Sequence, residues 1–220
     1  MSGIIGDNVG RSGGLIKAAA AGATVDGRWT LLDTTTFGSD ASTFDYEPTF
    51  MQSAYTYKLL KVSVWGLNPV DNDRAINMRW KEAASADGAI DASFMTSGYY
   101  SGLWSWDYSG TNHRSQDAAG EINLGWENFN QKGTSNKWFP YEFYIKDGGM
   151  TASTSGSTDY GNHMWWEGNM CAANDGQGQK TSGVGMSGYD IHGLQWFASS
   201  GNMDAGMIVT TYYDNQLGSH

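Results

Sequence analysis

Short runs in which apolar and polar residues alternate recur along most of this chain. The clearest run covers residues 55–66, where apolar side chains alternate with polar or amphipathic ones: Leu60, Val62 and Val64 against Lys61, Ser63 and Trp65. Side chains that alternate with a period of two lie on opposite faces of a β-strand. The run therefore predicts a central, half-buried strand.

Comparable alternation predicts further strands, at residues 28–33, 74–82, 121–127, 138–146, 163–171, 189–198 and 207–213. Strands that follow one another along a chain commonly pair antiparallel, and we expect this for residues 55–66 with 74–82. The last two runs flank Ser, Gly, Asn and Asp between Ser199 and Gly206, which are turn-forming residues. They predict a hairpin from Tyr189 to Tyr213.

The segments between these runs are rich in Gly, Ser, Thr and Asn, and no long segment has the 3.6-residue periodicity of a helix. Residues 148–161 and 174–188 are predicted loops. Residues 93–108 concentrate aromatic side chains among Ser and Gly without a regular period, and the pattern assigns no secondary structure to residues 93–120. The prediction is an all-β fold, an antiparallel β-sandwich of the jelly-roll type.

The N-terminal segment, residues 1–27, differs from the rest because it contains many glycines and only one apolar patch, Leu15 and Ile16. Such a segment cannot bury a core of its own, so an extended arm is predicted, either disordered or lying on a neighbouring subunit. Arg11, Leu15 and Ile16 are its candidate assembly residues. Residues 28–220 are predicted to form a single domain.

Charge and targeting signals narrow the function classes. The 220 residues have a formal net charge of −10, and the 13 basic residues are scattered, which argues against a nucleic-acid partner. No apolar run approaches the length of a membrane span, and no signal peptide is recognisable near Ala18. The single cysteine, Cys171, cannot form an intrachain disulfide. No membrane partner is expected.

Motifs that would indicate catalysis or a cofactor are weak. Gly183 to Gly188 match GxGxxG, but the match leads into a predicted strand, whereas a dinucleotide site needs it before a helix. No metal-ligand spacing is present, and His163 and Glu167 do not form an HExxH pair. No catalytic, cofactor or metal residue is predicted, and the chain is expected not to be an enzyme. Carboxylates on facing strands could hydrolyse glycosides, yet the sequence selects no pair among Glu121, Glu127, Glu142 and Glu167.

Aromatic residues are unusually frequent, with 10 Trp and 12 Tyr. Exposed Trp and Tyr rings occur at subunit interfaces, and they can also stack on sugar rings. Alternation predicts that Trp165 and Trp166 lie on opposite faces of their strand, one in the core and the other exposed or at an interface. The candidate interface or glycan-platform residues are Trp104, Trp106, Trp165, Tyr99 and Tyr100.

Three segments stand near the two ends of the chain: Asn8–Ala18, Trp29–Asp33 and the SSGN-containing Ile191–Met207. They resemble the ends of a group of tailed-bacteriophage virion proteins that are common in marine phages. The resemblance covers the Trp-rich middle poorly, and the last strand departs from the usual ending because the chain continues to His220. The resemblance implies a Gly-rich arm, a β-rich body and a virion location after assembly in the host cytoplasm. It implies no catalytic residues.

The first functional hypothesis is therefore a non-enzymatic virion structural protein, a capsid decoration or fibre-like protein whose partners are other copies of itself and other virion proteins. The alternative is a carbohydrate-binding tail-fibre or adhesin domain with a host glycan as partner. A glycosidase is a third hypothesis, and the fold alone would not imply it.

Overall fold

The structure, a computed structural model, describes residues 24–25, 28–51, 59–71, 74–82, 94, 99–107, 110–124, 140–146, 162–171, 178–187 and 191–216. Of residues 99–107 and 110–119 it describes the backbone only. The predicted arm residues Arg11, Leu15 and Ile16 lie outside the described residues. Among the described residues, no helix has the length and hydrophobicity needed to cross a membrane.

The described elements are almost entirely strands, as predicted. In chain order they are β1 Thr24–Val25, β2 Trp29–Thr36, β3 Thr43–Tyr46, the 3₁₀ turn η1 Thr49–Met51, β4 Leu59–Trp65, β5 Ile76–Glu82, β6 Tyr99–Asp107, β7 Gly110–Ala119, β8 Ile122–Asn123, β9 Tyr141–Lys146, β10 Asn162–Cys171, β11 Gly178–Ser187, β12 Ile191–Ala198 and β13 Ile208–Asp214.

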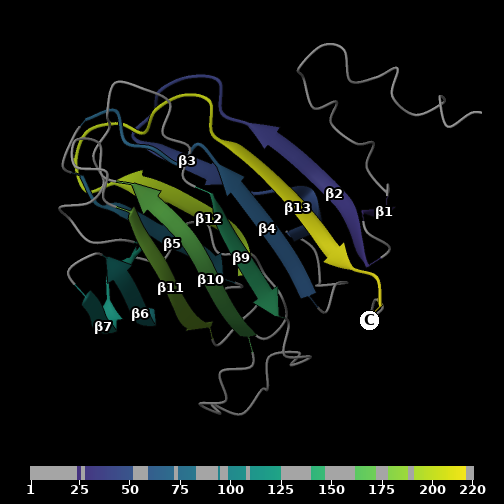
Figure 1. Cartoon of the computed structure of the whole chain (residues 1–220). Coiled ribbons are helices and arrows are strands. Elements are labelled where there is room, and N and C mark those ends of the chain that lie inside the picture. The colour runs from purple at the N-terminus through teal and green to yellow at the C-terminus, as the bar shows by residue number, and fades with distance from the viewer. Residues whose placement is uncertain are drawn as a thin grey trace, which may run out of the picture.

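These strands form two antiparallel sheets that face each other, so the predicted all-β sandwich is confirmed (Figure 1). The large sheet has the order β1-β2-β13-β4-β9-β10-β11-β6-β7, and the small sheet has the order β3-β12-β5-β8. Along the chain, β2, β4, β9 and β13 belong to the large sheet and alternate with β3, β5, β8 and β12 of the small sheet. The chain therefore crosses between the layers repeatedly.

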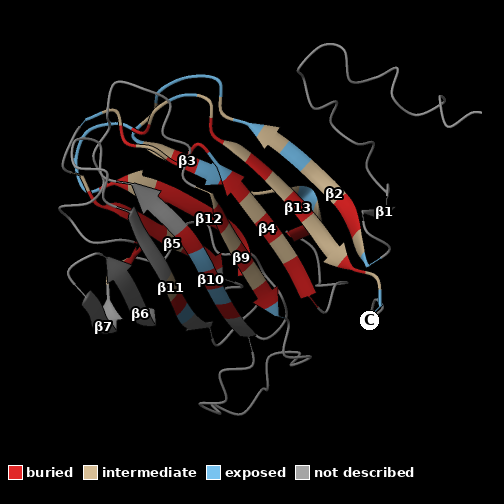
Figure 2. Cartoon of the chain, in the orientation of Figure 1, coloured by how far each residue is buried: buried red, intermediate tan, exposed pale blue. Residues whose placement is uncertain are grey.

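The core lies between the two sheets. Along β4 and β9, buried residues alternate with half-buried or exposed ones, as Figure 2 shows by its alternating colours. The fully buried large side chains come from both layers and include Trp80, Trp196, Phe143 and Trp166. The Trp196 ring of β12 lies 5.9 Å from the Phe143 ring of β9, centroid to centroid. Aromatic contact across the layers thus joins the sheets.

The predicted hairpin from Tyr189 to Tyr213 is wrong, because β12 and β13 lie in different sheets. β12 pairs with β3 and β5, whereas β13 pairs with β2 and β4. Residues 199–207 between them are held at one end of the sandwich by backbone hydrogen bonds: Met203 exchanges two with Ala41, and Asp204 N–H donates to Asn68 O. Ile191 to Trp196 are all buried, which suits an inner strand covered on both sides.

The predicted pairing of residues 55–66 with 74–82 fails in the same way, because β4 is in the large sheet and β5 in the small one. The predicted loop at 174–188 is also wrong over most of its length, since residues 178–187 form β11. The unassigned stretch 93–120 contains β6 and β7. The predicted strand at 121–127 is described as far as Leu124, and only Ile122–Asn123 pair.

The two ends of the described chain meet at the first strand of the body. Asp214, whose side chain is fully buried, binds Arg28 at 2.7 Å, and Asn215 N–H donates to Arg28 O. The predicted arm ended at residue 27, yet its residues Thr24 and Val25 already pair with β2 as β1. Thr24 and Val25 are thus part of the large sheet.

Candidate functional site

The outer face of the large sheet, away from the core, combines exposed aromatic and charged side chains. Antiparallel register sets these side chains in rows across the strands. The first row, the aromatic row, contains Tyr212, Lys61, Tyr144, Trp165 and Val184. The second, the acidic row, contains Thr210, Ser63, Glu142, Glu167 and Ser182. Each row crosses β13, β4, β9, β10 and β11.

Aromatic rings form a continuous group along the first row. Tyr144 and Trp165 stack with their centroids 5.2 Å apart and their planes 7° from parallel. Trp29 lies 6.2 Å from Tyr144, and the Lys61 ammonium lies 5.9 Å from the Trp29 centroid. Trp165 is 36% exposed, whereas Trp166 is buried in the core, so the prediction that these neighbours face opposite sides is confirmed.

The acidic row places two carboxylates side by side, because Glu142 of β9 and Glu167 of β10 occupy directly paired positions. Lys61 Nζ lies 2.8 Å from Glu142 Oε1, and the Tyr144 hydroxyl donates to Glu142 Oε2 at 2.7 Å. Burial alone would raise the pKa of Glu142, but hydrogen bonds from Lys61 and Tyr144 outweigh it and hold this pKa below its usual value. Burial is the main cause that raises the pKa of Tyr144, and the hydrogen bond to Glu142 raises it further. Glu142 is therefore an anion at neutral pH.

Replacing Lys61 should reverse the pKa shift of Glu142. In Lys61→Met, the raising effect of burial remains while the largest opposing hydrogen bond is lost, so we expect the Glu142 pKa to rise above that of the wild type. Carboxyl carbon shifts in an NMR titration measure it. Because the wild-type pKa is depressed, the stability it contributes is present above the unfolded-state pKa and lost as the pH falls through the folded one.

Lys146→Met is the matched control, since Lys146 is exposed at the end of the same strand, β9. An unchanged Glu142 titration in Lys61→Met would show that the ion pair does not set this pKa.

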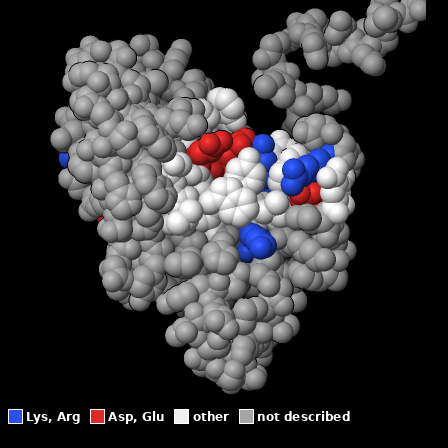
Figure 3. Space-filling model, turned by 60° about the horizontal axis from the view of Figure 1, so that its bottom comes forward, with Lys and Arg blue, Asp and Glu red and all other residues white. Residues whose placement is uncertain are grey.

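A hollow of about 530 Å³ adjoins Trp165 on this face. Its lining includes Tyr144, Trp165, Glu167, Ser182 and Val184. The volume lies within the range of about 300–1,000 Å³ typical of small-molecule sites. Figure 3 shows acidic and basic side chains beside one another among uncharged residues, so neither sign of charge dominates the described surface in that view.

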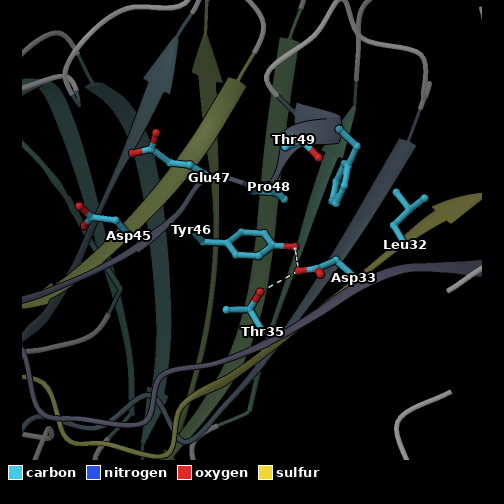
Figure 4. Close-up of a pocket in the computed structure, with 9 residues that line it drawn as sticks. Leu32, Asp33, Thr35, Asp45, Tyr46, Glu47, Pro48 and Thr49 are labelled. Atoms are coloured by element: carbon cyan, nitrogen blue, oxygen red, sulfur yellow. Dashed lines mark hydrogen bonds between the residues drawn. The ribbon is translucent and has the colours of Figure 1, made fainter. Parts of the chain in front are cut away.

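A second hollow of about 300 Å³ lies between β2 of the large sheet and β3, an edge strand of the small sheet (Figure 4). There, Tyr46 Oη donates to Asp33 Oδ2 at 3.1 Å, and Thr35 Oγ1 donates to the same oxygen at 2.8 Å. Since the one phenolic proton goes to Asp33, the Thr211 hydroxyl, 2.6 Å away, donates to Tyr46. Burial raises the pKa of Tyr46, so the phenol stays protonated.

The acidic groups that line this second hollow each have a partner within the fold. Figure 4 shows the carboxylates of Asp45 and Glu47 directed away from Asp33, so the acidic groups do not converge. Asp45 accepts from Gln195 Nε2 at 2.9 Å, and Glu47 pairs with Lys81 at 2.8 Å. Within the part of the chain that the structure describes, no group of three or more His, Cys, Asp or Glu side chains could hold a metal ion.

The Tyr46 hydroxyl joins the two sheets, so removing it should destabilise the protein. We expect Tyr46→Phe to lower the free energy of unfolding by about 1–3 kcal/mol, because Thr211 and Asp33 lose a buried partner. Urea denaturation measures the change. Tyr212→Phe on the outer face is the control, expected within about 0.5 kcal/mol of the wild type; equal losses for the two variants would contradict the role of Tyr46.

The structure places all five predicted platform residues in the large sheet, four on β6 and Trp165 on β10. The register places Trp104 of β6 opposite Ser182, which continues the acidic row, and places Trp106 opposite Lys180. Tyr100 pairs with Met186, and Tyr99 with Ala119 of β7. The side chains of these four aromatic residues lie outside what the structure describes. Of the five predicted platform residues, Trp165 is thus the one whose side-chain contacts the structure describes.

Sequence reasoning missed Tyr144 and the pairing of Glu142 with Glu167. Tyr144 belonged to a predicted strand, and alternation already put it on the face opposite Phe143. The partner of each glutamate follows only from the register of β9 with β10. The GxGxxG match falls within strand β11 as far as Ser187, so it lacks the following helix that a dinucleotide site requires.

Comparison of the chain with models of known protein families, with curated proteins and with solved structures finds no match.

Proposed function

We propose that this chain is a non-enzymatic structural protein of a bacteriophage virion, a capsid decoration or fibre-like protein that forms homo-oligomers. The interleaving of its strands supports the proposal most. β2, β13, β4 and β9 lie in one layer and β3, β12, β5 and β8 in the other, which fits the double Greek key of a jelly roll. Viral capsid domains use this fold, as lectins do.

Fold alone does not assign function, and the resemblance of both chain ends to tailed-phage virion proteins supplies the second support. β1, at the edge of the large sheet, ties the base of the arm to the body. The preceding residues thus start from a fixed point and, at about 3.3 Å per extended residue, are long enough to reach a neighbouring subunit. Burial of apolar surface between subunits is the proposed mechanism of assembly.

Light scattering on the full chain, alone and with purified capsids, tests this proposal. We expect a homo-oligomer, weakened in the arm variant Leu15→Asp/Ile16→Asp, because two charges would have to be buried at the contact. Ser12→Asp adds a charge to the same arm without removing an apolar side chain, and should associate like the wild type. A monomer that associates neither with itself nor with capsids would refute the proposal.

A second function, a carbohydrate-binding fibre or adhesin domain, has one observation in its favour. The stacked Tyr144–Trp165 pair is partly exposed beside carboxylates and a hollow, a combination of apolar ring and hydrogen-bonding groups that suits a sugar. The two functions are compatible, since a virion protein can also bind a receptor.

A further inference from the structure

We propose that the outer face of the large sheet binds a neutral pyranose sugar at Trp165, with Glu167, which lines the adjoining hollow, accepting hydrogen bonds from its hydroxyl groups. This inference rests on the second proposed function, and it assigns the site and the ligand class. Three features of the face support it: a fixed aromatic ring, adjacent hydrogen-bond acceptors and an unfavourable environment for other occupants.

The ring of Trp165 is held ready to stack. Tyr144 packs parallel to it at 5.2 Å, and the Tyr144 hydroxyl is tied to Glu142, so the pair is ordered before a ligand arrives. Beyond Trp165 in the row, Val184 is 45% exposed and lines the hollow. The faces of aromatic rings carry negative potential and attract the weakly positive C–H groups of a pyranose ring.

Hydrogen-bond acceptors lie in the acidic row, next to the aromatic row that contains Trp165. Glu142 and Glu167 occupy paired positions, and Ser182 follows Glu167 in the row. Both oxygens of Glu142 are engaged by Lys61 and Tyr144, whereas Glu167 lines the hollow beside Trp165. A carboxylate accepts strong, charge-assisted hydrogen bonds from hydroxyl groups. A sugar on Trp165 would therefore find an apolar contact beneath its ring and acceptors beside its hydroxyl groups.

The same acidic row disfavours other occupants. An anionic sugar would lie against two carboxylates, in a chain whose net charge is −10. The nearby ammonium of Lys61 is already engaged by Glu142 at 2.8 Å. A second copy docked by two-fold symmetry would set the same patch against itself and so bring acidic rows together. A neutral sugar avoids both repulsions.

Binding of the full chain to an array of neutral and anionic glycans, followed by calorimetry with the best ligand, tests the inference. We expect a neutral glycan to bind, Trp165→Ala to weaken it about tenfold or more, and Glu167→Gln to weaken it several-fold. Trp65→Ala is the matched control, because Trp65 is 50% exposed on the same face. It lies two strands and four residues from Trp165, about 16 Å away, and should bind like the wild type.

The possible outcomes test the proposed site and the proposed function separately. A wild-type chain that binds no glycan would refute the second proposed function and the inference together. Glycan binding that survives both Trp165→Ala and Glu167→Gln would overturn the site while leaving that function standing. Preference for anionic glycans would overturn the ligand class. Thermal melts of each variant show whether a loss of binding reflects unfolding.

Discussion

Replacing Trp196 by alanine should lower the free energy of unfolding by about 3–5 kcal/mol, the usual loss for a large aromatic side chain removed from a core. Trp196 is completely buried on β12, where its ring contacts Phe143 of the opposite sheet at 5.9 Å and Tyr46 at 6.5 Å. The loss would be large because the cavity opens between the layers. Chemical denaturation followed by circular dichroism measures it.

The neighbouring residue provides the control. Phe197 lies on the other face of β12, half-buried, with the Arg79 guanidinium 4.5 Å from its ring centroid. Phe197→Ala should lose about 1 kcal/mol. A double-mutant cycle of Trp196→Ala with Phe143→Ala should show coupling, since the two rings touch. Additive losses, or equal losses at Trp196 and Phe197, would contradict the packing of β12 across the core from β9.

The second large effect is expected at Gly168 of β10. A Cβ atom there would overlap the Tyr141 ring, because that ring covers this glycine from the paired strand. Tyr141 is itself buried and its hydroxyl donates to Leu124 O at 3.2 Å. Moving its ring away from β10 would therefore break this hydrogen bond. We expect Gly168→Ala to destabilise the protein by about 1–3 kcal/mol through overpacking.

Gly38→Ala is the matched control, since an added Cβ there meets no atom within 4 Å. It should change the unfolding free energy by at most about 0.5 kcal/mol. Thermal denaturation of the two variants compares them directly. If Gly168→Ala melts like Gly38→Ala, the close approach of Tyr141 to β10 is wrong.

The sequence predicted local features well because strand periodicity is local. Alternation located β4 and β9 and separated Trp165 from Trp166. It failed for β11, where Gly183 sits opposite Trp166 and has no side chain to mark the inner face. Polar β7 gave no apolar period either.

Pairing could not be predicted because it depends on contacts distant in sequence. Neighbouring strands such as β12 and β13 looked like a hairpin, yet the fold places them in opposite layers. The candidate site could not be predicted for the same reason. Glu142 and Glu167 become neighbours only once β9 and β10 are in register.

Copy number on the virion tests the proposed function most directly. Quantitative mass spectrometry of phage particles purified from cells that produce this chain, before and after stepwise dissociation, would measure it. We expect the chain to be present at a fixed number of copies per particle and to dissociate together with capsid or fibre proteins. Particles that lack the chain while infected cells contain it would contradict a virion role.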